Sequence, residues 1–272
     1  MQWTELTGDA FTEAVAQCEG VCLVPLSVVE RHGHHLPLGT DMYIGRELCR
    51  RAAALEPALV FPDNVFTQIP EARHVPGTIS IEGDLILRLL DNLCREIARN
   101  GLTKILLVNA HGGNQSLLRF FHELQLYAPR DYVVYLVQSF TLGSGVEVPW
   151  ETSSDLHAGA GETSLMLAAQ PDLVHMERAP ATGEGTALGR LRPLRDAGVH
   201  TGIWWYADHP THYAGDARAA TAEMGERLLT SMAEGLAQAV RAIKADTVTR
   251  QLQDEFYAAA KAPGNHAPGS GA

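Results

Sequence analysis

The feature that most constrains the fold of this chain is its alternation of short apolar runs with amphipathic helical stretches. The apolar runs are the segments 21–26, 58–62, 104–108 and 132–137. Between them, Leu and Ile residues recur at helical spacing, most clearly over residues 85–97. This alternation is typical of a parallel sheet covered by helices, so the sequence predicts an α/β fold with a mostly parallel sheet.

The second half of the chain contains helical and irregular stretches. A helix is predicted over residues 162–169, and helical periodicity resumes near residue 216. Residues 179–215 are rich in Gly, Pro and His, which indicates a long loop region. No repeat or linker divides the chain, so we expect one domain over residues 1–261. The Pro- and Gly-rich tail at 262–272 is expected to be disordered.

Chain length and cysteine usage limit the possible role of a metal. With 272 residues, 46% of them hydrophobic, the chain can bury a large core without a disulfide or a structural metal. Any metal ion is therefore expected to be catalytic. The four cysteines form no pairable framework and no CxxC motif, so we expect Cys18, Cys22, Cys49 and Cys94 to be reduced thiols.

The formal net charge is −11, and no cluster of Lys and Arg offers a basic face. Nucleic acids and anionic membranes need such a face, so neither partner is expected. The N-terminus has no signal-peptide pattern, and no apolar run approaches the roughly 18 to 20 residues that span a membrane. The expected location is the cytoplasm.

Polar side chains crowd the segment that directly follows the first predicted strand. Three histidines and two carboxylates lie between Glu30 and Asp41, where open α/β sheets bind their ligands. Glu30 and His32 share a face of an extended backbone, and Asp41 can fold back toward them after a Pro/Gly turn. Carboxylate and imidazole without thiolate suit Zn²⁺, Mn²⁺ or Fe²⁺. Ordinary loop histidines are the alternative, but their crowding at a strand end favours a metal site.

A second polar cluster, NAHGGN, follows the strand predicted at 104–108. It places His111 at another strand end, and Gly112 and Gly113 allow close backbone approach. Asn114 is a good N-cap for the next helix. A plain strand–turn–helix connection is the alternative for this segment.

A third cluster places His157 and Glu162 on either side of a Gly-rich bend. A histidine and a carboxylate in this arrangement suit proton transfer beside a metal-bound water. The alternatives are a loop histidine and a first-turn helix acid favoured by the helix dipole.

Candidate substrate contacts lie in the long loop region. Trp204, Trp205 and Tyr206 offer flat apolar walls for a small ring, or else form a core aromatic cluster. Further candidates are Arg73, His74 and His212.

The motifs ERHGHHLPLGTD, NAHGGN and HAGAGETS together resemble those of the creatininase (creatinine amidohydrolase) family. The resemblance runs in order over about residues 20–225 and includes the segments VPGTIS and HYAGD. It implies a three-layer α/β/α fold, two divalent metal ions (Zn or Mn, with Fe as the alternative) and a homo-oligomer, usually a hexamer.

The resemblance also implies roles for individual residues. Glu30, Asp41 and His111 would surround one metal ion. His32 and Glu162 would hold the second, with Asp41 bridging the pair. His157 occupies the position of the proton-transferring histidine of the family, and Glu162 is a candidate for the same proton transfer.

One position departs from creatininase itself, in which a metal-ligating Glu follows the motif histidine by two residues. Here that position is Gly113, so creatinine is a doubtful substrate and Glu162 is the natural substitute ligand. Family members that share HGGN act on formamides, on peptides, or on cyclic ketosugars whose ring is opened hydrolytically. The expected function is metal-dependent hydrolysis of a small carbonyl substrate at a C–N bond, with these reactions as alternatives. A non-catalytic metal or small-molecule binding protein and a scaffold protein are the non-enzymatic alternatives.

Overall fold

The computed structural model describes residues 1–142 and 145–263. At its centre lies a parallel sheet in the order β2-β1-β3-β4. The strands are β1 (Val21–Leu26), β2 (Leu59–Val60), β3 (Lys104–Asn109) and β4 (Val133–Gln138). Every residue of β1 is buried, as expected for a strand covered on both faces.

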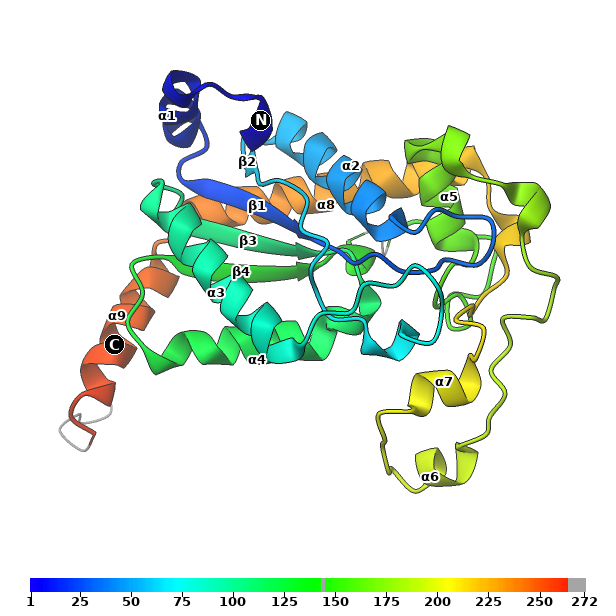
Figure 1. The fold of residues 1–272 in the computed structure, drawn as a ribbon. Coiled ribbons are helices and arrows are strands. Elements are labelled where there is room, and N and C mark those ends of the chain that lie inside the picture. The colour runs from blue at the N-terminus through cyan, green and yellow to red at the C-terminus, as the bar shows by residue number, and fades with distance from the viewer. Residues whose placement is uncertain (143–144, 264–272) are drawn as a thin grey trace.

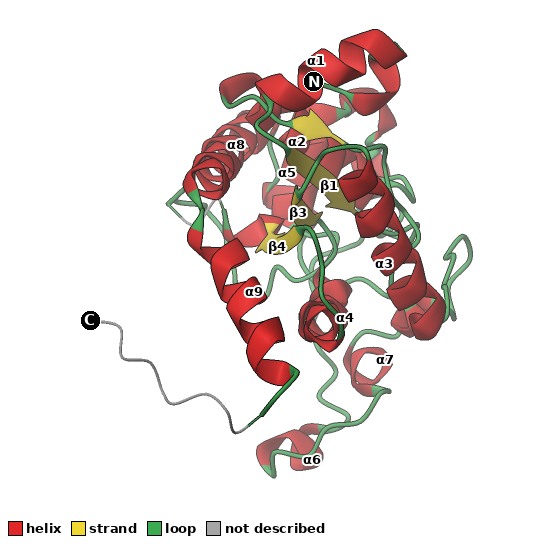
Figure 2. Cartoon of the chain, turned by 90° about the vertical axis from the view of Figure 1, so that its left-hand side faces the viewer, coloured by secondary structure: helices red, strands yellow, loops and turns green. Residues whose placement is uncertain are grey.

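Helices cover both faces of the sheet. One face packs against α2 (Thr40–Leu55), α5 (Ala160–Ala169) and α8 (Ala222–Ala245). The other packs against α1 (Gly8–Gln17), α3 (Gly83–Arg99) and α4 (Gln115–Leu124). Figure 2 shows α3 and α8 on opposite sides of the strands. The three-layer α/β/α architecture is therefore confirmed.

The two cores follow from the alternation of side chains along the strands. Val21 and Leu23 of β1 join the core beneath α2, α5 and α8. Cys22, Val24 and Leu26 join the core beneath α1, α3 and α4. The four cysteines are buried and unpaired in the described chain, which confirms the expectation of free thiols.

The remaining elements are short helices and a C-terminal helix. The region predicted as a long loop contains α6 (Arg192–Asp196) and α7 (Trp204–Asp208), and α9 (Val248–Ala260) follows α8. Short 3-10 helices lie at Trp3–Glu5, Pro70–Ala72, Gly112–Asn114, Gln125–Tyr127, Ser139–Thr141, Pro171–Leu173, Met176–Arg178 and Ala217–Ala219. The tail predicted to be disordered lies, from residue 264 onward, outside the described residues. Over the described ranges, no helix combines the length and apolarity that a membrane span needs.

The sheet register brings the first two polar clusters together. Leu26, the last residue of β1, pairs with Asn109, the last residue of β3. The backbone N–H of Ala110 then donates to the Leu26 carbonyl at 2.9 Å, so the two segments leave the sheet side by side. The strand arrows in Figure 1 point toward the side of the molecule that carries α5, α6 and α7. An antiparallel bridge between His157 and Ala214 attaches the third cluster to this side.

Candidate metal centre

The loop after β1 is closed on itself before α2 begins. The backbone N–H of Glu30 donates to the Leu38 carbonyl at 3.0 Å, which returns the chain toward its starting point. Asp41 is the second residue of α2. Its Oδ1 lies 3.0 Å from Nε2 of His32. The loop therefore brings Asp41 back to His32, in the way that the Pro/Gly turn predicts.

Three buried side chains converge on one point between β1 and β3. Nδ1 of His111 lies 2.8 Å from Oε1 of Glu30 and 3.1 Å from Oδ2 of Asp41. Neither of these carboxylate oxygens has a hydrogen-bond partner among the described residues, although both are buried. Ligand atoms about 2.1 Å from one ion lie about 3 Å apart when they subtend a right angle. The residues present therefore fit a divalent metal ion.

A second group of donors lies on the other side of Asp41. Nε2 of His32 lies 3.0 Å from Oδ1 of Asp41 and 3.7 Å from Oε2 of Glu162. The Glu162 side chain is 30% exposed, whereas that of Asp41 is 1% exposed. Asp41 thus directs one oxygen toward each group, and Glu162 stands where solvent or a substrate can reach it.

His157 lies between these groups. Its Nε2 donates a hydrogen bond to the Arg31 carbonyl at 2.8 Å and lies 3.9 Å from Oε2 of Glu30. Its ring is 4.3 Å from that of His32. One donor atom each from His157, His32 and Glu162 could also share a metal ion. Ala158, which has a φ of 57°, donates its backbone N–H to Oε2 of Glu162 at 2.6 Å.

Burial and opposite charges together set the protonation of the cluster. Burial lowers the pKa of His32, but the carboxylates of Asp41 and Glu162 outweigh it and raise this pKa to about 10. Burial likewise opposes the charge on His111, and Glu30 and Asp41 raise its pKa well above the usual value. Without a metal ion, both imidazoles therefore carry a proton that a cation must displace.

Metal affinity should consequently rise with pH. Because the pKa of His32 in the metal-free site is about 10, the histidine is protonated throughout the neutral range. Each displaced proton should raise the apparent affinity about tenfold per pH unit below that pKa. Competition with a chelator of known protonation, at pH 6, 7 and 8, measures this slope. A metal affinity that does not vary with pH would show that metal binding displaces no proton from the histidines.

Two residues from the region around α7 support Glu30: His212 contacts it directly, and Trp205 contacts His212. Nε2 of His212 lies 2.6 Å from Oε2 of Glu30, and Nε1 of Trp205 donates to Nδ1 of His212 at 2.8 Å. An indole N–H can only donate, so Nδ1 of His212 must accept and its Nε2 must carry the proton given to Glu30. His212 is 2% exposed and has a φ of 60°, in the left-handed region. Burial lowers its pKa to about 4, which keeps it neutral.

This arrangement predicts that Trp205→Phe weakens the metal site while keeping the aromatic ring. Loss of the indole donor frees His212 to change tautomer and loosens Glu30, and outer partners of metal ligands typically contribute about 10–100-fold in affinity. The matched control is Trp204→Phe, because Trp204 is 54% exposed. Chelator competition on the two variants is the measurement. Equal affinities in both would show that the Trp205 hydrogen bond does not support Glu30.

Asn114 is the N-cap residue of α4, as predicted, but its side chain makes no capping hydrogen bond. Its Oδ1 accepts from the backbone N–H of Gln68 at 3.0 Å, and its Nδ2 donates to Thr67 at 2.9 Å and to Asn109 at 3.0 Å. The N–H of Gln68 therefore occupies the side-chain oxygen that would otherwise accept from the helix N–H groups. As a result, Asn114 ties the turn after β3 to residues 67–68.

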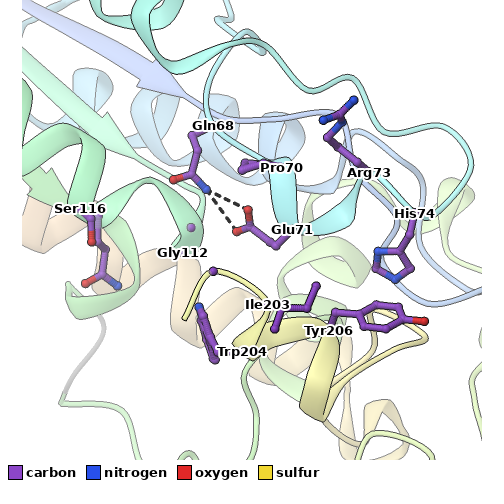
Figure 3. Close-up of a pocket in the computed structure, with 13 residues that line it drawn as sticks. Gln68, Pro70, Glu71, Arg73, His74, Gly112, Ser116, Ile203, Trp204 and Tyr206 are labelled. Carbon is purple, nitrogen blue, oxygen red and sulfur yellow. Dashed lines mark hydrogen bonds between the residues drawn. The ribbon is translucent and has the colours of Figure 1, made fainter. Parts of the chain in front are cut away.

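A cavity of about 980 Å³ opens beside this turn (Figure 3). Of the predicted substrate contacts, four line it: Arg73, His74, Trp204 and Tyr206. The rings of His74 and Tyr206 meet edge to face at 4.8 Å. Trp205 and His212 do not line the cavity; His212 instead hydrogen-bonds Glu30, and Trp205 hydrogen-bonds His212. Gly112 and Gly113, which directly follow His111 in the chain, are among the residues that line the cavity.

Among the polar residues of this cavity that sequence reasoning missed are Gln68 and Glu71. Nε2 of Gln68 donates to the Glu71 carboxylate at 2.9 and 3.3 Å (Figure 3). Burial raises the pKa of Glu71, and the charge of Glu30 adds to this effect. No periodicity marks the segment that carries them. The only signal available was its position between a strand and the VPGTIS segment.

The chain is similar in sequence to a known protein family and to several of its members. A sequence model named Creatininase and described as creatinine amidohydrolase matches residues 4–240. Creatinine amidohydrolase of Pseudomonas putida is 27% identical over 261 residues, which cover 87% of this chain and 95% of that protein. Mycofactocin precursor peptide peptidase of Mycolicibacterium smegmatis is 32% identical over 226 residues, which cover 80% of this chain and 83% of the relative.

Solved structures agree with these matches. A creatininase variant with a tryptophan-to-phenylalanine substitution superposes with a TM-score of 0.74 at 26% identity, covering 90% of this chain and 99% of that one. Creatininase structures include a manganese form and a Zn-Zn form.

Proposed function

The chain belongs to the creatininase family, whose members are hydrolases, and we propose that it is a metal-dependent hydrolase that cleaves a C–N bond. The observation that carries the proposal is the convergence of Glu30, Asp41 and His111 on one point, with two buried carboxylate oxygens that face Nδ1 of His111 but make no hydrogen bond among the described residues. Such atoms are costly to bury unless a cation satisfies them.

We propose about two divalent ions per chain, because Asp41 directs one oxygen to each of two donor groups. Glu30, Asp41 and His111 would hold the first, and Asp41, His32 and Glu162 the second. Oxygen and imidazole donors suit zinc or manganese, and iron as well. When bound, such ions lower the pKa of a water molecule and polarise a carbonyl group.

The proton transfers fall to His157 and Glu162. The Arg31 carbonyl holds Nε2 of His157, so this ring has a fixed orientation between the two donor groups. The backbone N–H of Ala158 holds one oxygen of Glu162. Either group lies close enough to the cluster to carry a proton to a leaving nitrogen. We assign the proton shuttle to His157 and a ligand role to Glu162.

The cavity beside Gly112 and Gly113 is the proposed substrate site. Its aromatic and polar walls (Trp204, Tyr206, His74 and Gln68 among them) suit a substrate with flat groups and hydrogen-bonding groups. Relatives include the creatinine amidohydrolase and the precursor peptide peptidase. They also include a formylamino-pyrimidine deformylase of Methanothermus fervidus, 29% identical over 143 residues, about half of each chain. Each of these names describes hydrolysis of a C–N bond, which is the substrate class we propose.

The test combines elemental analysis with a substrate panel. Protein reconstituted with Zn²⁺ or Mn²⁺ is assayed on creatinine, a formamide series, short peptides and a cyclic ketose, with and without chelator. We expect chelator-sensitive hydrolysis of at least one C–N substrate. Bound metal below about half an equivalent per chain would overturn the metal centre. Metal binding without hydrolysis of any member would favour a non-catalytic binding protein.

The expected hexamer and the cytoplasmic location stay predictions. Sedimentation at micromolar concentration decides the first, and a monomer would contradict it.

A further inference from the structure

Gly113 occupies a place where a side chain does not fit. A Cβ atom there would lie 2.5 Å from Oε1 of Glu71 and 2.5 Å from Nε2 of His111. At the preceding glycine, Gly112, a Cβ would meet no described atom within 4 Å. Only the second glycine of the HGGN motif is therefore required by its surroundings. The space beside it is taken by a carboxylate from a distant segment.

His111 has an unsatisfied donor on this side. Its Nδ1 faces Glu30 and Asp41, and its Nε2 is buried without a hydrogen-bond partner among the described residues. A histidine that ligates through one ring nitrogen is neutral and carries its proton on the other. Metal-ligating histidines almost always give that proton to a carboxylate, a carbonyl or a water.

Glu71 is fixed beside this donor by the turn that carries His111. Gln68 donates more closely to Oε2 of Glu71, at 2.9 Å, than to Oε1, at 3.3 Å, so Oε1 is the freer oxygen. The backbone N–H of Gln68 is in turn held by Asn114, in the same turn as His111. Because Oε1 of Glu71 and Nε2 of His111 both lie 2.5 Å from one point, they are no more than about 5 Å apart. That separation suits a direct contact after a small rotation, or one bridging water.

We propose that Glu71 is a positioning residue of the metal centre, whose Oε1 accepts the Nε2 proton of His111 directly or through one water molecule. This contact holds the imidazole with Nδ1 toward Glu30 and Asp41. The inference rests on the proposed metal centre, in which Glu71 is not itself a metal ligand. It also explains Gly113, since any side chain at that position would separate the two partners.

The test compares variants by cobalt binding rather than by activity alone. Chelator competition gives the Co²⁺ affinity, and the visible absorption of bound Co²⁺ reports the ligand geometry. Glu71→Ala should lower the affinity about 10–100-fold and change the spectrum. Glu71→Gln should restore part of the affinity, because its amide oxygen still accepts a hydrogen bond. If Glu71 only stabilised the fold, Glu71→Gln would not bind Co²⁺ more tightly than Glu71→Ala, and the spectrum of bound Co²⁺ would not change.

Gly113→Ala and Gly112→Ala are the matched pair. Gly113→Ala should reproduce the loss seen in Glu71→Ala, and Gly112→Ala should bind like the unmodified protein. Thermal unfolding of all variants in chelator tests the fold, and if Gly113→Ala does not fold, the Glu71 variants decide alone. Unchanged Co²⁺ affinity and spectrum in Glu71→Ala would overturn this inference while leaving the proposed function intact. Absence of Co²⁺ binding in the unmodified protein would overturn both.

Discussion

Asp41→Ala should remove both ions of the proposed metal centre and lower hydrolysis by roughly 10³-fold or more, because metal ions contribute several kcal/mol to transition-state stabilisation. Asp41 is the residue whose two oxygens face the two donor groups separately, at 3.0 Å from His32 and 3.1 Å from His111. Each of the other proposed ligands belongs to only one donor group, so removing one of them leaves the second group unchanged. Removing Asp41 weakens both at once, and it removes a carboxylate that raises the pKa of both His32 and His111.

Elemental analysis and turnover on the same preparation measure this effect. Bound metal should fall below about half an equivalent per chain after dialysis. The matched control is Asp63→Ala, because Asp63 pairs with Arg46 near the surface and touches none of the proposed ligands. Thermal unfolding in chelator separates metal loss from unfolding. If Asp41→Ala keeps one full equivalent, Asp41 does not bridge, and the two groups are independent sites.

The parts of the fold that follow from local pattern were predictable. The apolar run at 21–26 and the helical spacing over 85–97 correspond to β1 and α3, because periodicity reports which side chains face a core. The edge strand β2 is shorter than the predicted 58–62. Pro62 has no N–H for a further ladder bond.

The inner site was predictable for a related reason. Parallel neighbouring strands end at the same edge, so the polar residues after β1 and β3 had to meet. This brings Glu30, which follows β1, close to His111. Asp41 needed only a turn to return it to His32.

The outer contacts were not predictable, because they depend on loops whose course is set by tertiary packing. Nothing in residues 200–215 indicates that His212 would hydrogen-bond Glu30 or that Trp205 would hydrogen-bond His212. Likewise, Glu71 belongs to a 3-10 helix without periodicity. The unusual φ of His212 is visible only in three dimensions. Sequence pattern therefore identifies the polar side chains that converge at strand ends better than it identifies what holds them in place.

His157→Ala and Glu162→Gln should separate proton transfer from metal binding. If His157 is a shuttle, His157→Ala keeps both ions and the fold but loses about 10²–10⁴-fold in rate, the usual contribution of a general acid–base group. Its hydrogen bond to the Arg31 carbonyl orients the ring without involving a ligand oxygen. Glu162→Gln should instead weaken one ion, because an amide is a poorer ligand than a carboxylate and Glu162 faces His32 at 3.7 Å.

Metal content and turnover must be measured together on these two variants, because a fall in rate alone does not distinguish the roles. Titration with added metal supplies the discrimination. Excess Zn²⁺ or Mn²⁺ should restore part of the activity of Glu162→Gln by refilling a weakened site, and it should not restore that of His157→Ala. His200→Ala is the control, because it removes a histidine side chain at an exposed position. If His157→Ala loses an ion while Glu162→Gln keeps both, His157 is the ligand and Glu162 carries the proton. One donor atom each from His157, His32 and Glu162 lies within 4.8 Å of the others, so the geometry admits that exchange and the paired measurement decides it.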